Sequence, residues 1–541
     1  MRLGRTRLMR LPMVGCAPGG FFVVDIWEMV GMRVRGLTRV LLCAGVVAGT
    51  VAVAPTPTVG TTPPASSSAA VAESSNFTLV GHNGLFNRGM NAGPAIFGDY
   101  LYVGSRTDAS AGHPHSGVLV VNIADPASPR VVGEIASPNE GNVGETSREL
   151  RVWPQQKILI VMNFTCSAFI HDCADVPVTP TFKFYDISGA NAAHPRLLTT
   201  YVPPAKPHEM FLWTDPNRPS RALLYYSVPN SEVTGSNLNV VDISGARDGD
   251  VHEVASFNPN RLYPASVRQV RDVALHSMGI NFQGTQAYLA YLGGGFLVAD
   301  TSDLAQNVSH PKIRLITPVQ NRVRYTNPGA HSAVKVPGRP LVVLTEEVYG
   351  DLLDFRDPAT GYVDDEGCPW GWVKIANIAD PRNPRVVGEY RTRQNRRSYC
   401  QTPAGQNPQN TDFTSYAAHN PTVLPNLAFV TWHSSGLQAL SIRNPANPQQ
   451  TGVFVPRPLE SVATEDPALS EGINKAVMWS YPIIREGLIY VIDIRNGLYI
   501  LRYTGEGAST VSKIGFYEGN SNLGAAQWLG TSPQSPGAPL G

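Results

Sequence analysis

The chain lacks any excess of one charge. Its 541 residues carry 43 Lys and Arg against 42 Asp and Glu, for a formal net charge of +1. No run of basic residues forms the stripe that binds nucleic acid, and no acidic tail is present. We therefore expect no nucleic-acid partner. The length leaves room for several ordinary domains or for one large repeat domain.

Motifs for several chemistries are also missing. The sequence has no Cys-x-x-Cys pair, which argues against a cysteine zinc site. It has no Gly-x-Ser-x-Gly, the elbow that carries a catalytic serine. One loop is rich in acids but misses the EF-hand spacing, so a solvated loop is favoured over a calcium site. Its acidic residues are Asp351, Asp354, Asp357, Asp364, Asp365 and Glu366.

The N-terminus has the features of a targeting segment. Arg33, Arg35 and Arg39 precede the apolar run Val40–Ala54, which is short and rich in small residues for a transmembrane helix. We interpret residues 1–54 as a signal segment, with Met32 as an alternative start. The expected mature chain is secreted or extracytoplasmic, or retained at the cell surface, and has no transmembrane span.

Export determines how the cysteines are interpreted. Cys16 and Cys43 leave with the signal, and an oxidising compartment favours disulfides among the four that remain. The expected pairs are Cys166–Cys173 and Cys368–Cys400, and a zinc site is the competing interpretation. Residues 55–75, rich in Thr, Pro, Ser and Ala, are predicted to form a flexible linker. Residues 520–541 are predicted to be a disordered tail.

One supersecondary unit recurs along the chain. Gly371–Tyr390 (GWVKIANIADPRNPRVVGEY) closely resembles Gly117–Ile135 (GVLVVNIADPASPRVVGEI). Alternating β-branched residues predict two strands, and the Asp-Pro pair predicts the turn between them. Apolar second strands are expected at Tyr100–Gly104, Ile158–Met162, Ala222–Ser227, Ala287–Leu292, Leu341–Thr345, Ala428–Trp432 and Leu488–Ile492. Third strands are expected to start at Val118, Phe182, Leu238, Phe296, Trp372, Leu437 and Leu498.

These copies predict an all-β fold, a seven-bladed β-propeller of four-stranded antiparallel blades over residues 76–519. A linear solenoid would need a stricter period, and two β-sandwiches would not explain why the turn motif recurs throughout. Either Phe77–Gly81 or Val511–Tyr517 completes the last blade. We expect a monomer.

The repeated phrases also indicate a family. NIADPxxPRVVGE, YDISGA and VVDISGA, with the blocks Ala417–Leu440 and Met478–Tyr503, resemble the LVIVD-repeat family of exported bacterial β-propellers. The similarity spans Asn76–Gly519 and implies the propeller, but it implies little about activity. A weaker likeness to selenium-binding and lactonase-type propellers, which hold metals on the axis, lacks their diagnostic motifs. No residue role is transferred from those families.

Propeller geometry gathers distant residues at one face. The starts of the first strands and the ends of the second strands share that face, together with long loops that contain the four mature cysteines. The residues expected at first-strand starts are Arg148, His208, Glu209, Arg271, Asp272, His331, His419 and Trp479. Those expected at second-strand ends are Glu346, Glu347 and His433.

His208, His331 and His419 come from three repeats at one strand position. Neutral imidazoles near carboxylates suit Zn, Cu, Fe or Mn, so these three are candidate ligands of a divalent transition metal. Glu209, Asp272, Glu346 or Glu347 would complete the shell or act as a general base. The alternative is structural, because polar residues at the channel also brace neighbouring blades.

The sequence favours a binding or interaction module that uses its loop-rich face, rather than an enzyme. Its partner would be a protein or small molecule of the cell envelope or exterior, which the residues do not identify. A metal-dependent hydrolase or oxidase with an axial site is the first alternative. A cell-surface structural protein is the second.

Overall fold

A computed structural model describes residues 71–136, 143–168, 171–229, 235–270, 273–325, 329–347, 368–407 and 414–529, all within the unit Pro64–Gly541. The predicted signal segment, the acidic loop after Glu347 and residues 530–541 lie outside the described residues, so these predictions stay open. None of the described helices is long and apolar enough to cross a membrane.

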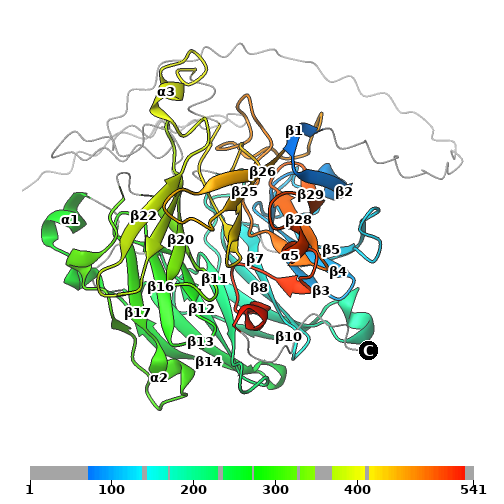
Figure 1. The fold of residues 1–541 in the computed structure, drawn as a ribbon. Helices are drawn as coiled ribbons and strands as arrows, with labels where there is room; N and C mark the ends of the chain where they lie inside the picture. Colours follow the sequence, from blue (N-terminus) through cyan, green and yellow to red (C-terminus); the bar gives the residue numbers. More distant parts are fainter. Residues whose placement is uncertain are drawn as a thin grey trace, which may run out of the picture. The chain divides into compact units, whose positions relative to one another are not determined.

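The described residues form antiparallel sheets, half of them four-stranded, with a few short helices between them (Figure 1). The first two groups of strands are β3 (Asn91–Phe97), β4 (Tyr100–Ser105), β5 (Val118–Asn122) and β6 (Arg130–Ile135), then β7 (Glu145–Trp153), β8 (Ile158–Thr165), β9 (Thr181–Asp186) and β10 (Arg196–Tyr201). A pairing of Ser105 with Ser147 joins these two groups into one sheet.

The next two sheets are β11 (Met210–Thr214), β12 (Ala222–Ser227), β13 (Leu238–Gly245) and β14 (Asp250–Phe257), then β15 (Leu275–Ile280), β16 (Gln286–Tyr291), β17 (Gly295–Asp300) and β18 (Arg314–Leu315). They are followed by β19 (Ala330–Lys335), β20 (Leu341–Glu346), β21 (Val373–Asn377) and β22 (Arg385–Tyr390). The last groups are β23 (Pro421–Val423), β24 (Leu427–Thr431), β25 (Leu437–Ser441) and β26 (Gln449–Pro456), then β27 (Ile483–Arg485), β28 (Leu488–Asp493) and β29 (Gly497–Tyr503).

The helices are all short. The α-helices are α1 (Ala265–Val270), α2 (Ser302–Ala305), α3 (Arg397–Cys400) and α5 (Ala508–Val511). The 3-10 turns are η1 (Leu85–Asn87), η2 (Gly189–Ala192), η3 (Ala246–Asp248), η4 (Asn260–Leu262), η5 (Val319–Asn321) and η7 (Ala525–Trp528).

The recurring turn forms as its residues predict. Asp380 accepts a hydrogen bond from the backbone N–H of Arg382 (3.0 Å) and another from the side chain of Asn383 (2.7 Å). The glycine of the following strand lets the next repeat approach. A Cβ added at Gly388 would lie 2.0 Å from the carbonyl oxygen of Pro445, in the turn of the next repeat. Small size at this position therefore sets how closely adjacent sheets pack.

The inner strands contact one another in sequence and return to the start. β3 contacts β7, and the contacts continue through β11, β15, β19 and β23. Thr422 in β23 donates to the carbonyl of Pro482, just before β27 (2.6 Å), and β28 contacts β3. Sheets repeated around a hub in this way make the all-β propeller that was predicted. The number of blades, seven in the sequence pattern, stays a prediction.

The N-terminal strands complete sheets from the other end of the chain. β2 (Phe77–Asn83) pairs with β29 as the outermost strand of the last sheet, with Phe77 opposite Tyr503. β30 (Phe516–Tyr517) instead pairs with β27 at the inner edge of that sheet. Of the two alternatives that the sequence left open, the segment at Phe77 is thus the outer strand.

Two boundaries differ from the expected ones. Val71–Ser75, expected in the linker, forms β1 and pairs with β26. Asn520–Leu529, expected in the disordered tail, packs against the hub. Leu212 donates to the carbonyl of Asn520 (3.2 Å) and accepts from the N–H of Asn522 (3.3 Å). The inner strand β11 has backbone groups that need partners, and this segment supplies them.

Candidate metal centre

Four histidines occupy the same place on successive inner strands. His208 and His419 lie just before β11 and β23, and His276 and His331 are the second residues of β15 and β19. The backbone N–H of His208 donates to Ser227 and that of His419 to Thr431, both at 2.9 Å. These bonds fix the backbone of His208 and of His419 beside the ends of the second strands β12 and β24. The sheets thus present the four rings at one end of the central axis that the inner strands surround. We call this end the mouth of the hub.

The four rings form a row. Ring centroids are 4.4 Å apart for His208 and His276, 4.0 Å for His276 and His331, and 3.9 Å for His331 and His419. His433, which follows β24, lies 5.0 Å from His419. His331 and His433 are fully buried.

Glu347 lies against this row of imidazoles. It follows β20, and its Oε1 is 3.1 Å from Nε2 of His419 and 3.2 Å from Nε2 of His433. Its Oε2 is 3.4 Å from Nε2 of His331 and 3.9 Å from Nε2 of His276. One buried carboxylate therefore faces four imidazoles from four segments of the chain.

Burial and neighbouring charge shape the protonation states. Burial, the largest effect, lowers the pKa of His208 and His331 well below the usual range and that of His276 to about 4. Burial would raise the pKa of Glu347, but the facing imidazoles of His419 and His331 outweigh it and hold that pKa well below its usual range. At neutral pH the centre thus combines the neutral imidazoles of His208, His276 and His331 with an ionised carboxylate, and both are donor types of transition-metal sites.

The outward ring nitrogens are anchored by hydrogen bonds. Nδ1 of His331 lies 2.7 Å from the hydroxyl of Ser332, and Nδ1 of His433 lies 2.8 Å from that of Ser415. Nδ1 of His419 lies 2.5 Å from the carbonyl oxygen of Trp479. Such partners orient each ring and direct its Nε2 inward, as second partners of metal-bound histidines do.

Two further predicted residues border the row. A carboxylate oxygen of Glu209 lies within 4.8 Å of ligand atoms of both His276 and His331. Burial and then Glu149 raise the pKa of Glu209 well above its usual range. Trp479 packs edge-on against His419 at 5.3 Å, and its indole N–H donates to Asn91.

Arg148 lies beside the imidazoles rather than among them. Its guanidinium lies 5.4 Å from the ring centroid of Phe164 and 5.8 Å from that of Trp479. Its positive charge contributes to the lowered pKa of His208.

Glu346 does not join the centre, and two other predicted residues lie outside the described part of the chain. Glu346 pairs with Lys374 in a buried ion pair, because successive strand residues point to opposite faces and Glu347 takes the inward place. Arg271 and Asp272 lie outside the described residues. The strand that they were expected to open begins instead at Leu275.

Sequence reasoning missed His276, which holds the place that was given to Arg271 and Asp272. A signal was present. Leu275–Ser277 and Ala330–Ser332 both read apolar-His-Ser at the start of an inner strand. Aligning these two motifs would have placed His276 beside His331.

A second buried polar network covers the same mouth. Nε of Arg106 is 3.4 Å and Nδ1 of His171 is 3.2 Å from Oδ2 of Asp466. The Arg106 guanidinium stacks on Trp479, with its central carbon 4.5 Å from the ring centroid. Both predicted disulfides form, Cys166–Cys173 next to this network and Cys368–Cys400 between two other loops. Each disulfide thus holds together the chain segments that it joins.

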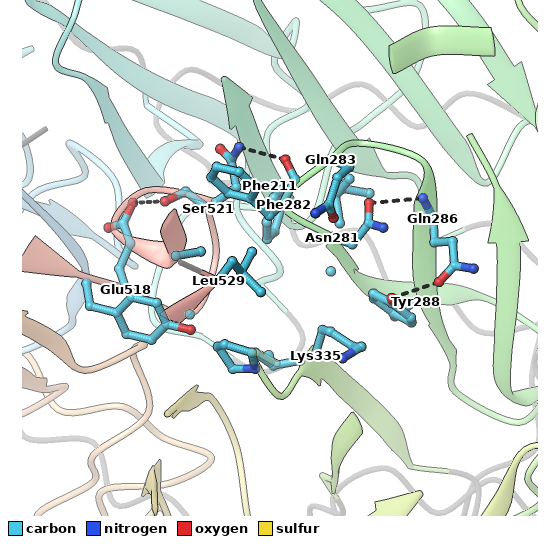
Figure 2. Close-up of a pocket in the computed structure, with 18 of the residues that line it drawn as sticks. Phe211, Asn281, Phe282, Gln283, Gln286, Tyr288, Lys335, Glu518, Ser521 and Leu529 are labelled. Atoms are coloured by element: carbon cyan, nitrogen blue, oxygen red, sulfur yellow. Dashed lines mark hydrogen bonds between the residues drawn. The ribbon is translucent and has the colours of Figure 1, made fainter. Parts of the chain in front are cut away.

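A separate pocket of about 170 Å³ lies at the other ends of the inner strands. Figure 2 shows it bordered by Phe211, Gln283, Lys335, Glu518 and Leu529. Its lining includes the ends of β15 and β19, whereas His276 and His331 lie at the starts of these strands. The pocket shares no residue with the imidazole row.

Comparisons with known proteins give distant structural matches and no family. No family model and no curated protein matches the chain. Among solved structures, Sqt1 from Saccharomyces cerevisiae is similar with a TM-score of 0.43 and 9% identity, over 78% of this chain and 98% of that chain. Sqt1 from Chaetomium thermophilum has a TM-score of 0.42 and 10% identity, over 77% and 85%. The Cps50 (Swd1) β-propeller domain of Myceliophteria thermophila has a TM-score of 0.39 and 10% identity, over 80% and 98%. Likeness at this level carries no argument about what the chain binds or does.

Proposed function

We propose that this protein is an exported β-propeller that holds a divalent transition metal ion at one mouth of its hub. Glu347, His331, His419 and His433 are the proposed ligands. Their Nε2 atoms and carboxylate oxygens converge within 3.4 Å in every Glu347–imidazole pair of this set. The two disulfides support export, because they persist in oxidising compartments.

One observation carries the proposal. Nδ1 of His419 faces the carbonyl of Trp479, which only accepts hydrogen bonds, so Nδ1 bears the proton. In the neutral ring Nε2 is then a bare lone pair, yet it points at the carboxylate of Glu347 from 3.1 Å. Two acceptors at that distance repel each other. A cation between them satisfies both, and a second proton on His419 is the competing explanation.

An ion at this place would have defined chemistry. Neutral imidazoles with one carboxylate suit Zn, Cu, Fe or Mn, and an open coordination position on such an ion activates water or binds substrate. We therefore place the protein among metal-dependent hydrolases or oxidases, ahead of a purely structural role at the cell surface.

Metal analysis tests the proposal. Protein exported from cells with its own leader, purified without chelator, is expected to contain stoichiometric transition metal by mass spectrometry. Glu347→Gln should remove it, since the substitution deletes the anionic ligand. The control is His252→Asn, because His252 is exposed and pairs only with Asp250 among the contacts described. Metal-free wild-type protein that also fails to bind added Zn²⁺ or Cu²⁺ would leave a structural imidazolium–carboxylate pair.

A binding role through the loop-rich face is the second candidate. The disulfides and the Arg106–His171–Asp466 network hold the loops of that face in place over the hub. A pre-ordered surface reduces the entropy cost of association. Pull-down from the envelope fraction tests it. A partner retained by Glu347→Gln protein would favour the interaction role over the metal role.

A further inference from the structure

The mouth of the hub holds more donors than one ion uses. Seven inward-facing groups surround it: His208, Glu209, His276, His331, Glu347, His419 and His433. A transition metal binds about four to six donors at roughly 2.0–2.2 Å, so donors on one ion lie about 3–4 Å apart. The row of imidazoles is longer than this.

The donor atoms fall into two groups. Ligand atoms of Glu209, His276 and His331 lie within 4.8 Å of one another, and so do those of His331, Glu347 and His419. Only His331 belongs to both groups. Its Nε2 makes no hydrogen bond to any described residue, although the side chain is fully buried. A buried nitrogen without a hydrogen-bond partner, between two sets of donors, is where cation ligation would offset the cost of burial.

Glu347 is oriented as a bridge. Its Oε1 faces His419 and His433, whereas its Oε2 faces His331 and, more distantly, His276. A carboxylate that binds a single ion directs one oxygen, or both, toward one point. Here the two oxygens address imidazoles on opposite sides of the group.

His208 and His276 provide the remaining donors. Their Nε2 atoms face each other at 2.9 Å, close to the separation of two donors on one ion. The buried carboxyl of Glu209 completes this side, against His276. Among the described residues, no hydrogen bond, ion pair or ring contact joins these three residues to His419 or His433.

We propose that the mouth holds two divalent ions bridged by Glu347, one with His419 and His433 and the other with His208, Glu209 and His276. His331 lies between them. The inference rests on the proposed metal-binding function and adds a second ion, the arrangement that clamps the two oxygens of a displacement reaction. Two divalent ions bring four positive charges, which the two carboxylates only half offset. An exchangeable anion, such as hydroxide or an anionic substrate, would therefore complete the site.

Counting ions tests the inference. Apo protein dialysed against Zn²⁺ and analysed by mass spectrometry is expected to retain about two ions per chain. Stepwise Co²⁺ titration should show two phases in the visible spectrum. Glu209→Gln and, separately, His276→Asn should remove one phase and one ion while the other ion stays bound. Circular dichroism and thermal melts identify a variant that fails to fold, and the second variant then decides.

The outcomes separate the two proposals. One ion in the wild type, or two ions in both folded variants, overturns the second site and leaves the first intact. No ion in the wild type overturns both. Loss of one ion in either folded variant, with His252→Asn still holding two, supports the pair.

Discussion

The two ends of the hub treat buried polar groups in opposite ways. At the pocket end, Arg151 donates to Glu149 (3.0 Å) and to the carbonyl of Met210 (2.7 Å), while Asn522 bonds to Thr214 in both directions. At the imidazole end, Nε2 of His208 and Nε2 of His276 share one hydrogen bond at 2.9 Å, whereas the buried Nε2 of His331 makes none to a described residue. Most buried polar groups that only stabilise a fold have hydrogen-bond partners. Under the proposed function, the groups without a hydrogen-bond partner mark the end where the ion binds.

Breaking the paired end should have the largest effect on stability. Arg151→Ala leaves the buried Glu149 carboxylate without its guanidinium, which costs about 3–5 kcal/mol of unfolding free energy. Urea denaturation measures the loss. The ion at Glu347, His419 and His433 should stay bound, because Arg151 contacts none of these three residues among the contacts described. Arg314→Ala, which removes an exposed ion pair with Asp303, is the control and should have no measurable effect. Loss of the ion at Glu347 from folded Arg151→Ala protein would contradict the separation of the two ends.

A metal ion bound at the imidazole end should stabilise the protein. A metal ion that binds only the folded chain adds about 2.7 kcal/mol when its concentration is 100 times its dissociation constant. We expect the thermal midpoint to rise by a few degrees with Zn²⁺ and to fall with a chelator. Glu347→Gln should abolish the shift. An equal shift in wild type and Glu347→Gln would mean that the ion binds elsewhere.

The disulfides distinguish the loops above the imidazoles. Cys368–Cys400 closes a segment with a separation of 32 residues, against 7 for Cys166–Cys173. Loop-closure entropy then predicts that replacing the longer pair by serine costs about 1 kcal/mol more than replacing the shorter pair. Denaturation of the two double variants in parallel measures the difference. A greater loss from the shorter pair would point to packing near Arg106 as the dominant effect.

A smaller, pH-dependent effect is expected at Asp186, away from both ends. Burial opposes its charge, but hydrogen bonds from Arg247, Ser188 and Asn191 outweigh it and lower its pKa to about 2. A lowered pKa means that the stabilisation is complete above about pH 4 and is lost as the pH falls toward 2. Asp186→Asn should therefore cost about 1 kcal/mol at neutral pH, and the difference from wild type should shrink in acid. A difference that does not change with pH would refute the assignment.

The local sequence determined the turns, the strands and the cysteine pairs. Asp380 and the proline that follows it specify a turn wherever they occur, because they cap backbone groups and restrict the chain over a few residues. Alternating β-branched residues likewise indicate the strands, and the mature cysteines indicate two bonds that the structure contains. The sequence also predicted that His208, His331 and His419 are neighbours. Residues at the same position of each repeat lie at similar distances from the propeller axis.

The tertiary structure decided which side chains face the imidazoles and which strands pair. A shift of one residue along a strand, or a different pairing partner, changes what a side chain contacts. Glu346 and Glu347 are chemically identical neighbours, yet one pairs with Lys374 and the other faces the imidazoles, since strand side chains alternate. His276 lies in the row because β15 begins at Leu275, which makes His276 the second residue of the strand. Two terminal segments pair with residues hundreds of positions away, namely Phe77–Asn83 and Asn520–Leu529. Their pairing depends on which strand edges remain open when the propeller closes.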